Sequence, residues 1–310
     1  MAMSTKVPAA IVGPGNIGTD LMMKLLYPGD ARRYTRPTVE ALNKITRDSI
    51  VEHYKKYYVP SGEWAGVAGD ITPKEAVTKL EKALGAWKGG PVAHVTMPFP
   101  DQISAKKVYL IPRPNSVQTY LVATNHAIDR KSPDYIDVQV MNRVLGSGPS
   151  SRLFRIIREE KGYTYGVGSG FSATKYLNHF TASTSVRTEV TEPALAELLK
   201  QFGDIRERAV PGDELADAKS AIVAGFVLAL ESPDAVLSRW MEQRQEGLPE
   251  DYWDTYTVKV NAVSADDVQR VAKKYVPLGN VQIIAVGDAS KIADLLKKFG
   301  TVEEVSPDMN

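Results

Sequence analysis

Residues 13–18 read Gly-Pro-Gly-Asn-Ile-Gly and match the pattern G-x-G-x-x-G, the most conspicuous chemical motif in the sequence. A strand-like run from Lys6 to Val12 precedes the motif, and a helical pattern from Thr19 to Leu26 follows it. In a dinucleotide-binding fold, such glycines let a pyrophosphate approach the backbone at a helix N-terminus, where unpaired N–H groups favour an anion. The candidate cofactor contacts are Gly13, Gly15 and Gly18.

The surroundings of this motif do not suit a dinucleotide. Such a site needs a second parallel strand with an acidic residue about 20 residues further on. Here residues 27–34 (Tyr-Pro-Gly-Asp-Ala-Arg-Arg-Tyr) intervene, and a helical pattern comes next. A single βα unit cannot form the crevice in which a dinucleotide lies. We therefore expect no cofactor in this chain and keep an NAD-binding dehydrogenase fragment as an alternative.

The residues that could bind a metal or act as nucleophiles are few and scattered. None of the four histidines lies within five residues of another, so no helix can present two imidazoles to one metal ion. These histidines are His53, His94, His126 and His179. The absence of cysteine excludes disulfides, thiolate zinc sites and cysteine nucleophiles. No serine has glycine at both the second position before it and the second position after it, so the nucleophile elbow of α/β-hydrolases is absent. We expect no metal site in this chain.

A second glycine-rich group, Gly-Ser-Gly-Pro, lies at residues 146–149. A phosphate-binding P-loop would continue with Gly-Lys-Ser or Gly-Lys-Thr, and this continuation is missing. The group is therefore predicted to form a tight turn between two helices, the second of which begins at Ser150 or Ser151. The residues proposed for this turn are Gly146, Gly148, Ser150 and Ser151.

Composition identifies a globular chain. With 310 residues, 43% hydrophobic and 24% charged, it can bury one or two cores. The net charge of only +1 argues against nucleic acid or an anionic membrane as a partner. Residues 221–230 are apolar but too few to span a bilayer, so they are predicted to form a buried core helix. The N-terminus lacks a signal-peptide pattern, which leaves a cytoplasmic or a periplasmic location open.

A segment near residue 45 recurs near residue 263. Matching positions are Thr46 and Ser264, Lys55 and Lys273, and Asp70 and Asp288, each pair 218 positions apart. This offset indicates a structural unit of about 210 to 220 residues, which is far longer than a solenoid repeat. The pattern therefore predicts two homologous domains in tandem, with only the second complete. We call residues 45–85 the first repeat and residues 263–300 the second repeat.

Both repeats are predicted to fold as helix, strand, helix. Thr46 and Ser264 are N-caps, and a Val-Pro pair stops the first helix in each repeat because proline restricts the residue before it. An alternating apolar strand then ends at a Gly-Asp turn, and a second helix begins near Thr72 or Ser290. This order favours an α+β fold, a mixed sheet with helices packed on one face, present as one complete copy and one truncated copy.

The remaining elements are predicted from local patterns. Residues 108–111 and 117–125 are predicted to be paired strands around a turn at residues 113–116. Two further strands alternate at residues 163–173 and 180–186. The helices are predicted at residues 134–145, 192–208, 212–230 and 234–246.

Residues 4–25 resemble the start of the acylating acetaldehyde dehydrogenases. That family's acyl transfer needs a catalytic cysteine, which this chain lacks. The resemblance stops near Leu26, so a chimeric N-terminus with a junction there is the favoured interpretation.

From about Tyr27 to Val305 the sequence resembles the pitrilysin/insulinase-type zinc metallopeptidases, in the branch that includes mitochondrial processing peptidase. The resemblance rests on residues 46–87, on residues 146–154 (Gly-Ser-Gly-Pro-Ser-Ser-Arg-Leu-Phe) and on residues 158–166 (Arg-Glu-Glu-Lys-Gly-Tyr-Thr-Tyr-Gly). It implies four segments: a dehydrogenase-like βα fragment at 1–26, the C-terminal third of a first peptidase-like domain at 27–90, a complete second domain at 91–305, and a tail at 306–310. Residues 89–91 (Gly-Gly-Pro) are the expected linker.

The resemblance also implies how the chain functions. Members of the family hold zinc with an inverted His-x-x-Glu-His helix in the first domain, and the part of this chain that would carry it, upstream of Thr46, is dehydrogenase-like instead. The half without zinc supplies an arginine and a tyrosine, seven residues apart, to substrate in a closed chamber, and Arg158 and Tyr165 match that spacing. Both side chains can donate hydrogen bonds to a carbonyl oxygen that gains charge. The glycine-rich turn would lie near the chamber interior.

The resemblance predicts a non-catalytic or truncated subunit that contributes contacts to a zinc-bearing partner. Alone, the chain is expected to be inactive, and zinc is expected in the partner. A third of an α+β domain has strands without neighbours, so we expect a homologous subunit or self-association to cover it. The alternative is a peptide- or protein-binding module without hydrolysis.

Overall fold

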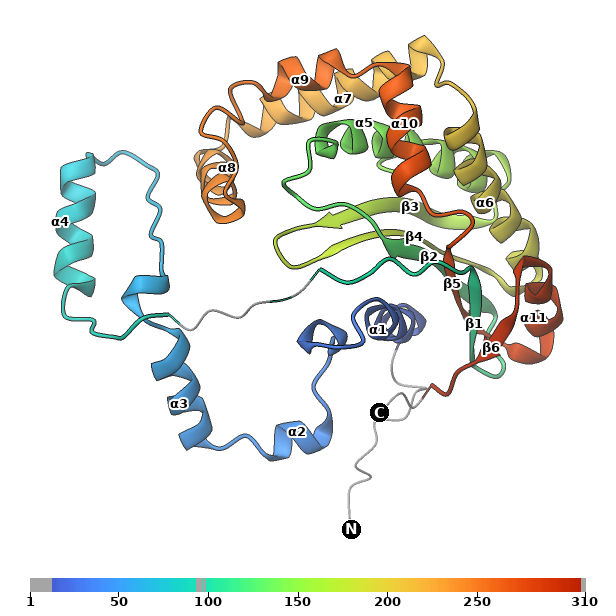
Figure 1. Cartoon of the computed structure of the whole chain (residues 1–310), viewed down its shortest axis with the longest axis horizontal. Helices are drawn as coiled ribbons and strands as arrows, with labels where there is room; N and C mark the ends of the chain where they lie inside the picture. The colour runs from blue at the N-terminus through green and yellow to red at the C-terminus, as the bar shows by residue number, and fades with distance from the viewer. Residues whose placement is uncertain (1–12, 93–96, 98, 308–310) are drawn as a thin grey trace. The chain divides into compact units, whose positions relative to one another are not determined.

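Six strands in the order β3-β4-β2-β5-β1-β6 form the central sheet of the larger of two units (Figure 1). The computed structural model describes residues 13–92, 97 and 99–307. Unit 1 consists of the described residues within 37–98 and 225–253, and unit 2 of those within 7–36, 99–224 and 254–310. The strands are β1 (Lys107–Pro112), β2 (Gln118–His126), β3 (Thr164–Ala173), β4 (Asn178–Arg187), β5 (Gln282–Gly287) and β6 (Val302–Glu304).

Strand β5 lies between β1 and β2, parallel to the first and antiparallel to the second. The predicted pairing of β1 with β2 is therefore wrong. All six residues of β5 are buried, and a strand that is buried on both faces takes a central position. The turn between β1 and β2 passes the end of β5, where the Arg113 N–H donates to the Gly287 carbonyl at 2.7 Å.

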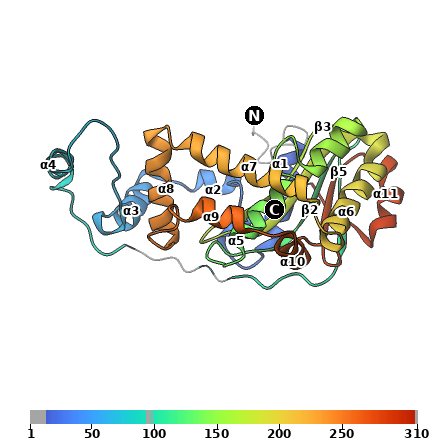
Figure 2. The same cartoon turned by 90° about the horizontal axis from the view of Figure 1, so that it is seen from above.

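One face of the sheet is covered by α5 (Tyr135–Leu145), α6 (Thr191–Glu207), α10 (Ala265–Tyr275) and α11 (Ala289–Leu296). Helices α6 and α11 lie side by side in both views (Figure 1 and Figure 2). Alternate strand residues point to this face and are fully buried. They include Val108, Leu110, Ala123, Phe180, Ala182, Ile283 and Ala285. The predicted fold class, a mixed sheet with helices, is confirmed.

Helix α1 (Pro14–Leu26) adds cover to the opposite face of the sheet (Figure 1). Its apolar side chains, including Ile17 and Leu21, form one core cluster with the strand residues Tyr109, Val122 and Ile284. The predicted helix at residues 19–26 thus forms and extends back to Pro14. The predicted strand at residues 6–12 lies outside the described residues.

Gly18 explains how closely α1 approaches the sheet. A Cβ atom at Gly18 would lie 2.9 Å from the Tyr120 ring, closer than real contacts allow. At Gly15 the nearest atom would be 3.7 Å away, an ordinary contact, and at Gly13 nothing lies within 4 Å. One glycine of the motif therefore serves helix–sheet packing.

Polar contacts fix the end of α1. The Tyr27 hydroxyl lies 2.9 Å from Nδ1 of His179, and His126 Nε2 donates to the Leu26 carbonyl at 2.5 Å. Burial, together with the nearby His126, lowers the pKa of His179 to about 4. Burial also lowers the pKa of His126, and both imidazoles hold the chain after α1.

Unit 1 contains α2 (Val39–Asn43), α3 (Arg47–Tyr57), α4 (Pro73–Leu84) and α8 (Pro233–Glu246). None of α2, α3 and α4 contains a buried residue. Packing in this unit centres on Phe226 and Trp253, whose rings stack at 5.9 Å, and on Arg239, whose carbonyl accepts a bond of 2.8 Å from the Trp253 indole.

The predicted buried helix at residues 221–230 is helical, but it is not buried. These residues end α7 (Gly212–Ala229), and within them only Phe226 is buried while Val227 and Leu228 are more than half exposed. Apolar composition indicated a core helix. Burial also requires another element to cover the helix, and in the described part of unit 1 only Phe226 is covered in this way.

The first helices of the two repeats have the same length and the same type of N-cap. Helix α3 and α10 begin and end 218 positions apart, and each opens with a capping box, at Thr46 and Ser49 and at Ser264 and Asp267. The strand predicted in the first repeat is wrong, because residues 63–68 have no strand structure. The second repeat does form its strand, β5. The difference is that β5 has β1 and β2 as neighbours.

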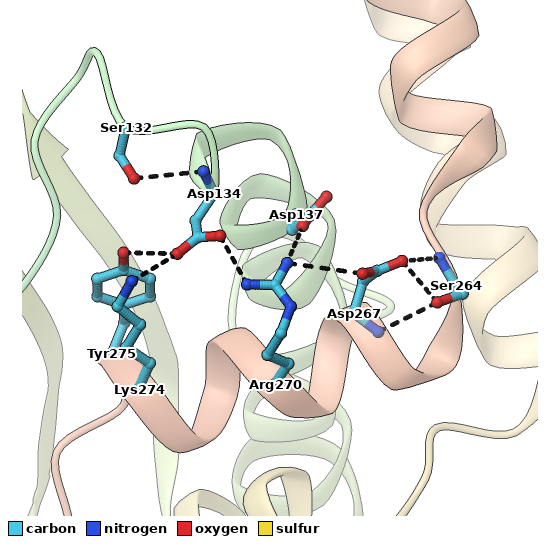
Figure 3. Close-up of polar contacts among 8 residues, drawn as sticks. All are labelled: Ser132, Asp134, Asp137, Ser264, Asp267, Arg270, Lys274 and Tyr275. Atoms are coloured by element: carbon cyan, nitrogen blue, oxygen red, sulfur yellow. Dashed lines mark hydrogen bonds and ion pairs between the residues drawn. The ribbon is translucent and has the colours of Figure 1, made fainter.

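An ionic cluster fastens α10 to the start of α5 (Figure 3). Asp134 accepts bonds from Arg270 at 2.6 Å, from Lys274 at 2.8 Å and from the Tyr275 hydroxyl at 2.8 Å. Arg270 also pairs with Asp137 at 2.5 Å. Asp134 occupies the N-cap position of α5, but its carboxylate binds α10 instead of the helix backbone. Burial acts to raise the pKa of Asp134, and the three bonds together outweigh it and lower the pKa to about 2.

We expect Gly18→Val to lower the thermal midpoint more than Gly15→Val does. Both changes add the same side chain to α1, but only at residue 18 does the new Cβ overlap the Tyr120 ring. Overpacking of this kind costs roughly 1–3 kcal/mol. Thermal denaturation of both variants measures the difference, and equal losses would contradict the packing role of Gly18.

We expect Asp134→Asn to cost about 2 kcal/mol of unfolding free energy at pH 7, because the folded pKa of about 2 lies below the ordinary value of 3.8. This stability is present above pH 3.8 and is lost as the pH falls towards 2, so variant and wild type should converge there. Denaturation measured from pH 2 to 7 checks this. The exposed pair Asp294–Lys297 provides the control, since Asp294→Asn should leave stability nearly unchanged.

Candidate functional site

The glycine-rich turn joins α5 to the next helical segment against strand β3. The N–H groups of Gly146 and Ser147 both donate to the Asn142 carbonyl at 2.9 Å and end α5. The Gly146 carbonyl accepts from the Ser169 N–H at 2.9 Å, so the turn is bonded to β3. A Cβ at Gly146 would lie 2.6 Å from the Ser169 nitrogen, which explains why glycine is required.

Side chains reinforce this attachment. Ser169 donates from its hydroxyl to Asn142 Oδ1 at 2.6 Å, and Asn142 Nδ2 donates to the Ser169 carbonyl at 3.0 Å. Sequence reasoning missed both residues. The signal for Asn142 was available, because it is an amide placed among the apolar positions of a predicted core helix.

The second half of the turn is also fixed. Gly148 has φ +98°, a left-handed conformation that favours glycine. The buried Ser151 hydroxyl donates to the Gly148 carbonyl at 2.7 Å, whereas Ser150 is exposed. Arg152, which is nearly buried, pairs with Glu214 at the start of α7, with its Nε 2.8 Å from the carboxylate. The predicted tight turn between two helices is therefore present.

Arg158 lies on the π-helical segment η3 (Phe154–Glu160) that follows this turn. Its side chain is exposed, and its guanidinium lies 4.5 Å from the centre of the Phe154 ring. The neighbouring Glu160 pairs with Arg155 at 2.6 Å, not with Arg158. Among the described residues, Arg158 has no carboxylate partner, so its donors face solvent.

Tyr165 is the most exposed large side chain near this segment, with 93% of its surface accessible. It lies in an irregular stretch of β3, where the pairing with β4 shifts between Thr164 and Val167. A short turn joins η3 to this strand, and in it the Gly162 N–H donates to the Arg158 carbonyl at 3.1 Å. Arg158 and Tyr165 thus lie on consecutive, connected elements, but no bond joins their side chains within the described structure.

A shallow hollow of about 320 Å³ lies on strands β3 and β4, starting three residues after Tyr165 along β3. Phe171 lines it together with small or polar residues, namely Gly168, Ser169, Gly170, Ser172, Thr181 and Ser183. Strand β3 is also an edge of the sheet. The surface could accept an extended segment of polypeptide, because an edge strand offers unpaired backbone groups.

The described residues contain no group of three or more His, Asp or Glu side chains that could hold a metal ion. His126 and His179, 53 positions apart in sequence, lie directly opposite each other on β2 and β4. Only the sheet register brings them together, so spacing could not find them. Both imidazoles make the contacts at the end of α1 described above. His94 lies outside the described residues.

Within residues 13–92, 97 and 99–307, no single helix has the length and apolar content needed to cross a membrane. Helices α7 and α8 pass that test only when taken together, and they are bent by 110° relative to each other.

Residues 44–222 match the family model described as the peptidase M16 inactive domain, which covers more than half of the chain. The chain belongs to the M16 inactive-domain family. This membership supports the predicted resemblance to pitrilysin-type zinc proteases, and the matched domain is the inactive one of that family.

Curated relatives agree with this membership. An uncharacterized zinc protease of Streptomyces coelicolor is 26% identical over 274 residues, which are 84% of this chain and 58% of that protein. A non-peptidase homolog of Helicobacter pylori is 23% identical over 257 residues, 82% of this chain and 58% of that protein. The M16 chain thus spans a little over half the length of these relatives.

A solved structure shows the same fold. A peptidase M16 inactive domain from Pseudomonas fluorescens superposes with a TM-score of 0.80 at 24% identity, covering 89% of this chain and 66% of that one. The chain therefore has the fold of this M16 domain.

We expect Gly146→Ala to destabilise the protein by roughly 1–3 kcal/mol, because the new methyl group would overlap the backbone of β3 at Ser169. Gly170→Ala is the matched control, since nothing lies within 4 Å of a Cβ there. Thermal unfolding of both variants tests this. If the two midpoints fall equally, the close approach of the turn to β3 is not what fixes it.

Proposed function

We propose that this M16 chain is a non-catalytic subunit that contributes Arg158 and Tyr165 to a peptide substrate held by a zinc-bearing M16 partner. The observation that carries the proposal is the exposure of both side chains on well-connected elements. Tyr165 is 93% accessible, and Arg158 lacks an acidic partner among the described residues, so neither is needed to hold the fold. Large polar side chains held outward in this way are available to bind.

The chemistry follows from the two donor groups. A guanidinium and a phenol can both donate hydrogen bonds to a peptide carbonyl oxygen as it gains negative charge during hydrolysis. The π-helix and the irregular stretch of β3 position these donors at either end of one short turn. In this proposal the zinc of the partner activates the attacking water. The hollow on β3 and β4 would then receive part of the substrate chain.

The inactive-domain match and the name of the Helicobacter pylori homolog support a role without intrinsic catalysis. We further propose that the chain belongs to the processing-peptidase branch and that residues 1–26 derive from a dehydrogenase-like piece. The second candidate function is a peptide-binding module without hydrolysis, which the open edge of β3 and its adjoining hollow favour.

The test is reconstitution of peptidase activity. The purified chain alone is expected not to cleave a quenched peptide, and adding a zinc-loaded M16 subunit with an intact His-x-x-Glu-His motif is expected to give chelator-sensitive cleavage. Arg158→Ala and Tyr165→Phe should each lower kcat by roughly 100- to 1,000-fold, the range seen when one transition-state donor is removed. Arg155→Ala is the matched control, because that exposed arginine is already paired with Glu160.

The outcomes separate the candidates. Full activity of both Arg158→Ala and Tyr165→Phe would contradict the proposed role of the two side chains. Binding of a fluorescent peptide without cleavage, under all these conditions, would favour the binding module. A fluorescence change on adding NADH would revive the dinucleotide alternative.

A further inference from the structure

Helix α3 in unit 1 carries an apolar face that nothing covers in the described structure. Ile50 is 59% exposed and Tyr54 is 52% exposed. Exposed apolar side chains in a row on one helix face mark a surface made for another element.

The second repeat shows what such a face is for. Val268 and Ala272, the residues 218 positions after Ile50 and Tyr54, are both fully buried. They lie on α10, which packs against α5 and α6. The same helix, with the same bounds and caps, is therefore a core helix in one repeat and a bare helix in the other.

A polar pair repeats as well. Lys56 lies with its Nζ 5.0 Å from the centre of the Tyr57 ring, and Lys274 lies 4.9 Å from that of Tyr275. In the second repeat this pair binds the carboxylate of Asp134 at the start of α5 (Figure 3). In the first repeat, no described carboxylate bonds to Lys56. The pair is positioned to receive an acidic residue at the start of another helix.

The segment after α3 indicates what accompanies that helix. Residues 64–69 correspond to β5, which pairs with a strand on each side, yet residues 64–68 form no strand and Trp64 and Val67 are about half exposed. A partner that covers α3 must therefore contribute strands as well as helices.

We propose that the α3 face binds the earlier part of an M16 first domain, namely a helix pair like α5 and α6 together with a sheet that lacks its closing strand. The length of a relative agrees with such a partner. This chain matches 58% of the Streptomyces coelicolor relative, so the other 42% of that protein lies outside the matched segment. A second copy of this chain does not fit, since its own α10 already covers its α5 and α6.

This inference deepens the proposed function, on which it rests for the identity of the partner, but it concerns docking and not catalysis. The probe is the part of the Streptomyces coelicolor relative that lies outside the matched segment, co-expressed with the full chain. Hydrogen exchange is then measured for the chain alone and in the co-purified complex. Residues 47–57 are expected to exchange freely in the chain alone and to become protected in the complex.

Substitutions on α3 identify the face. Ile50→Asp should abolish the complex while leaving the thermal midpoint of the chain alone unchanged, whereas Val268→Asp should unfold it. Lys56→Ala should weaken binding about tenfold, because it removes one bond to a charged group. Lys55→Ala is its matched control, with the same charge change on the neighbouring residue, whose counterpart Lys273 makes no bond to Asp134.

Each other result overturns the docking proposal. Protection of residues 47–57 in the chain alone would mean that a second copy covers the face. A complex that tolerates Ile50→Asp would place the interface elsewhere, and failure to form any complex would remove the proposed occupant. None of these results touches the reconstitution assay with a complete zinc subunit, so the proposed function can succeed or fail separately.

Discussion

Strand β5 is the constraint on which the rest of unit 2 depends. It arrives from the C-terminal part of the chain and is inserted between β1 and β2, which are joined by a short turn. The sheet is therefore complete only when β5, which follows α10 in the chain, is inserted between β1 and β2. The ionic cluster at Asp134 and the apolar face of α10 hold that returning segment against α5. Loss of the returning segment would leave β1 and β2 with facing, unpaired edges.

The first repeat shows what happens when the counterpart of β5 has no neighbouring strands. The first repeat contains α3, the counterpart of α10, and residues 64–69, the counterpart of β5. The described part of the structure contains no sheet that residues 64–69 join. The helices of the first repeat form because caps and helical propensity act locally, and its strand does not form because a strand needs neighbours. The exposed Ile50 and Tyr54 follow directly from this. In the described structure, α2, α3 and α4 are thus helices without buried residues.

The candidate site depends on the completed unit. The glycine-rich turn can bond to Ser169 only because β3 is held in place by β4, and Arg158 and Tyr165 lie on the segments that leave this turn. On the opposite face, α1 covers the strands β1, β2 and β5, with Gly18 against Tyr120. Helix α1 is therefore part of the core of this unit.

The sequence by itself determined what depends on neighbours along the chain. The helix bounds at Arg47–Tyr57 and Ala265–Tyr275, their caps and the tight turn at Gly146 and Gly148 were predictable, because each rests on local hydrogen bonds and backbone preferences. The tertiary structure alone decided the position of β5, the pairing of His126 with His179 and the burial of α10 against the exposure of α3. These depend on which distant segment is present to pack, and a local pattern carries no information about that.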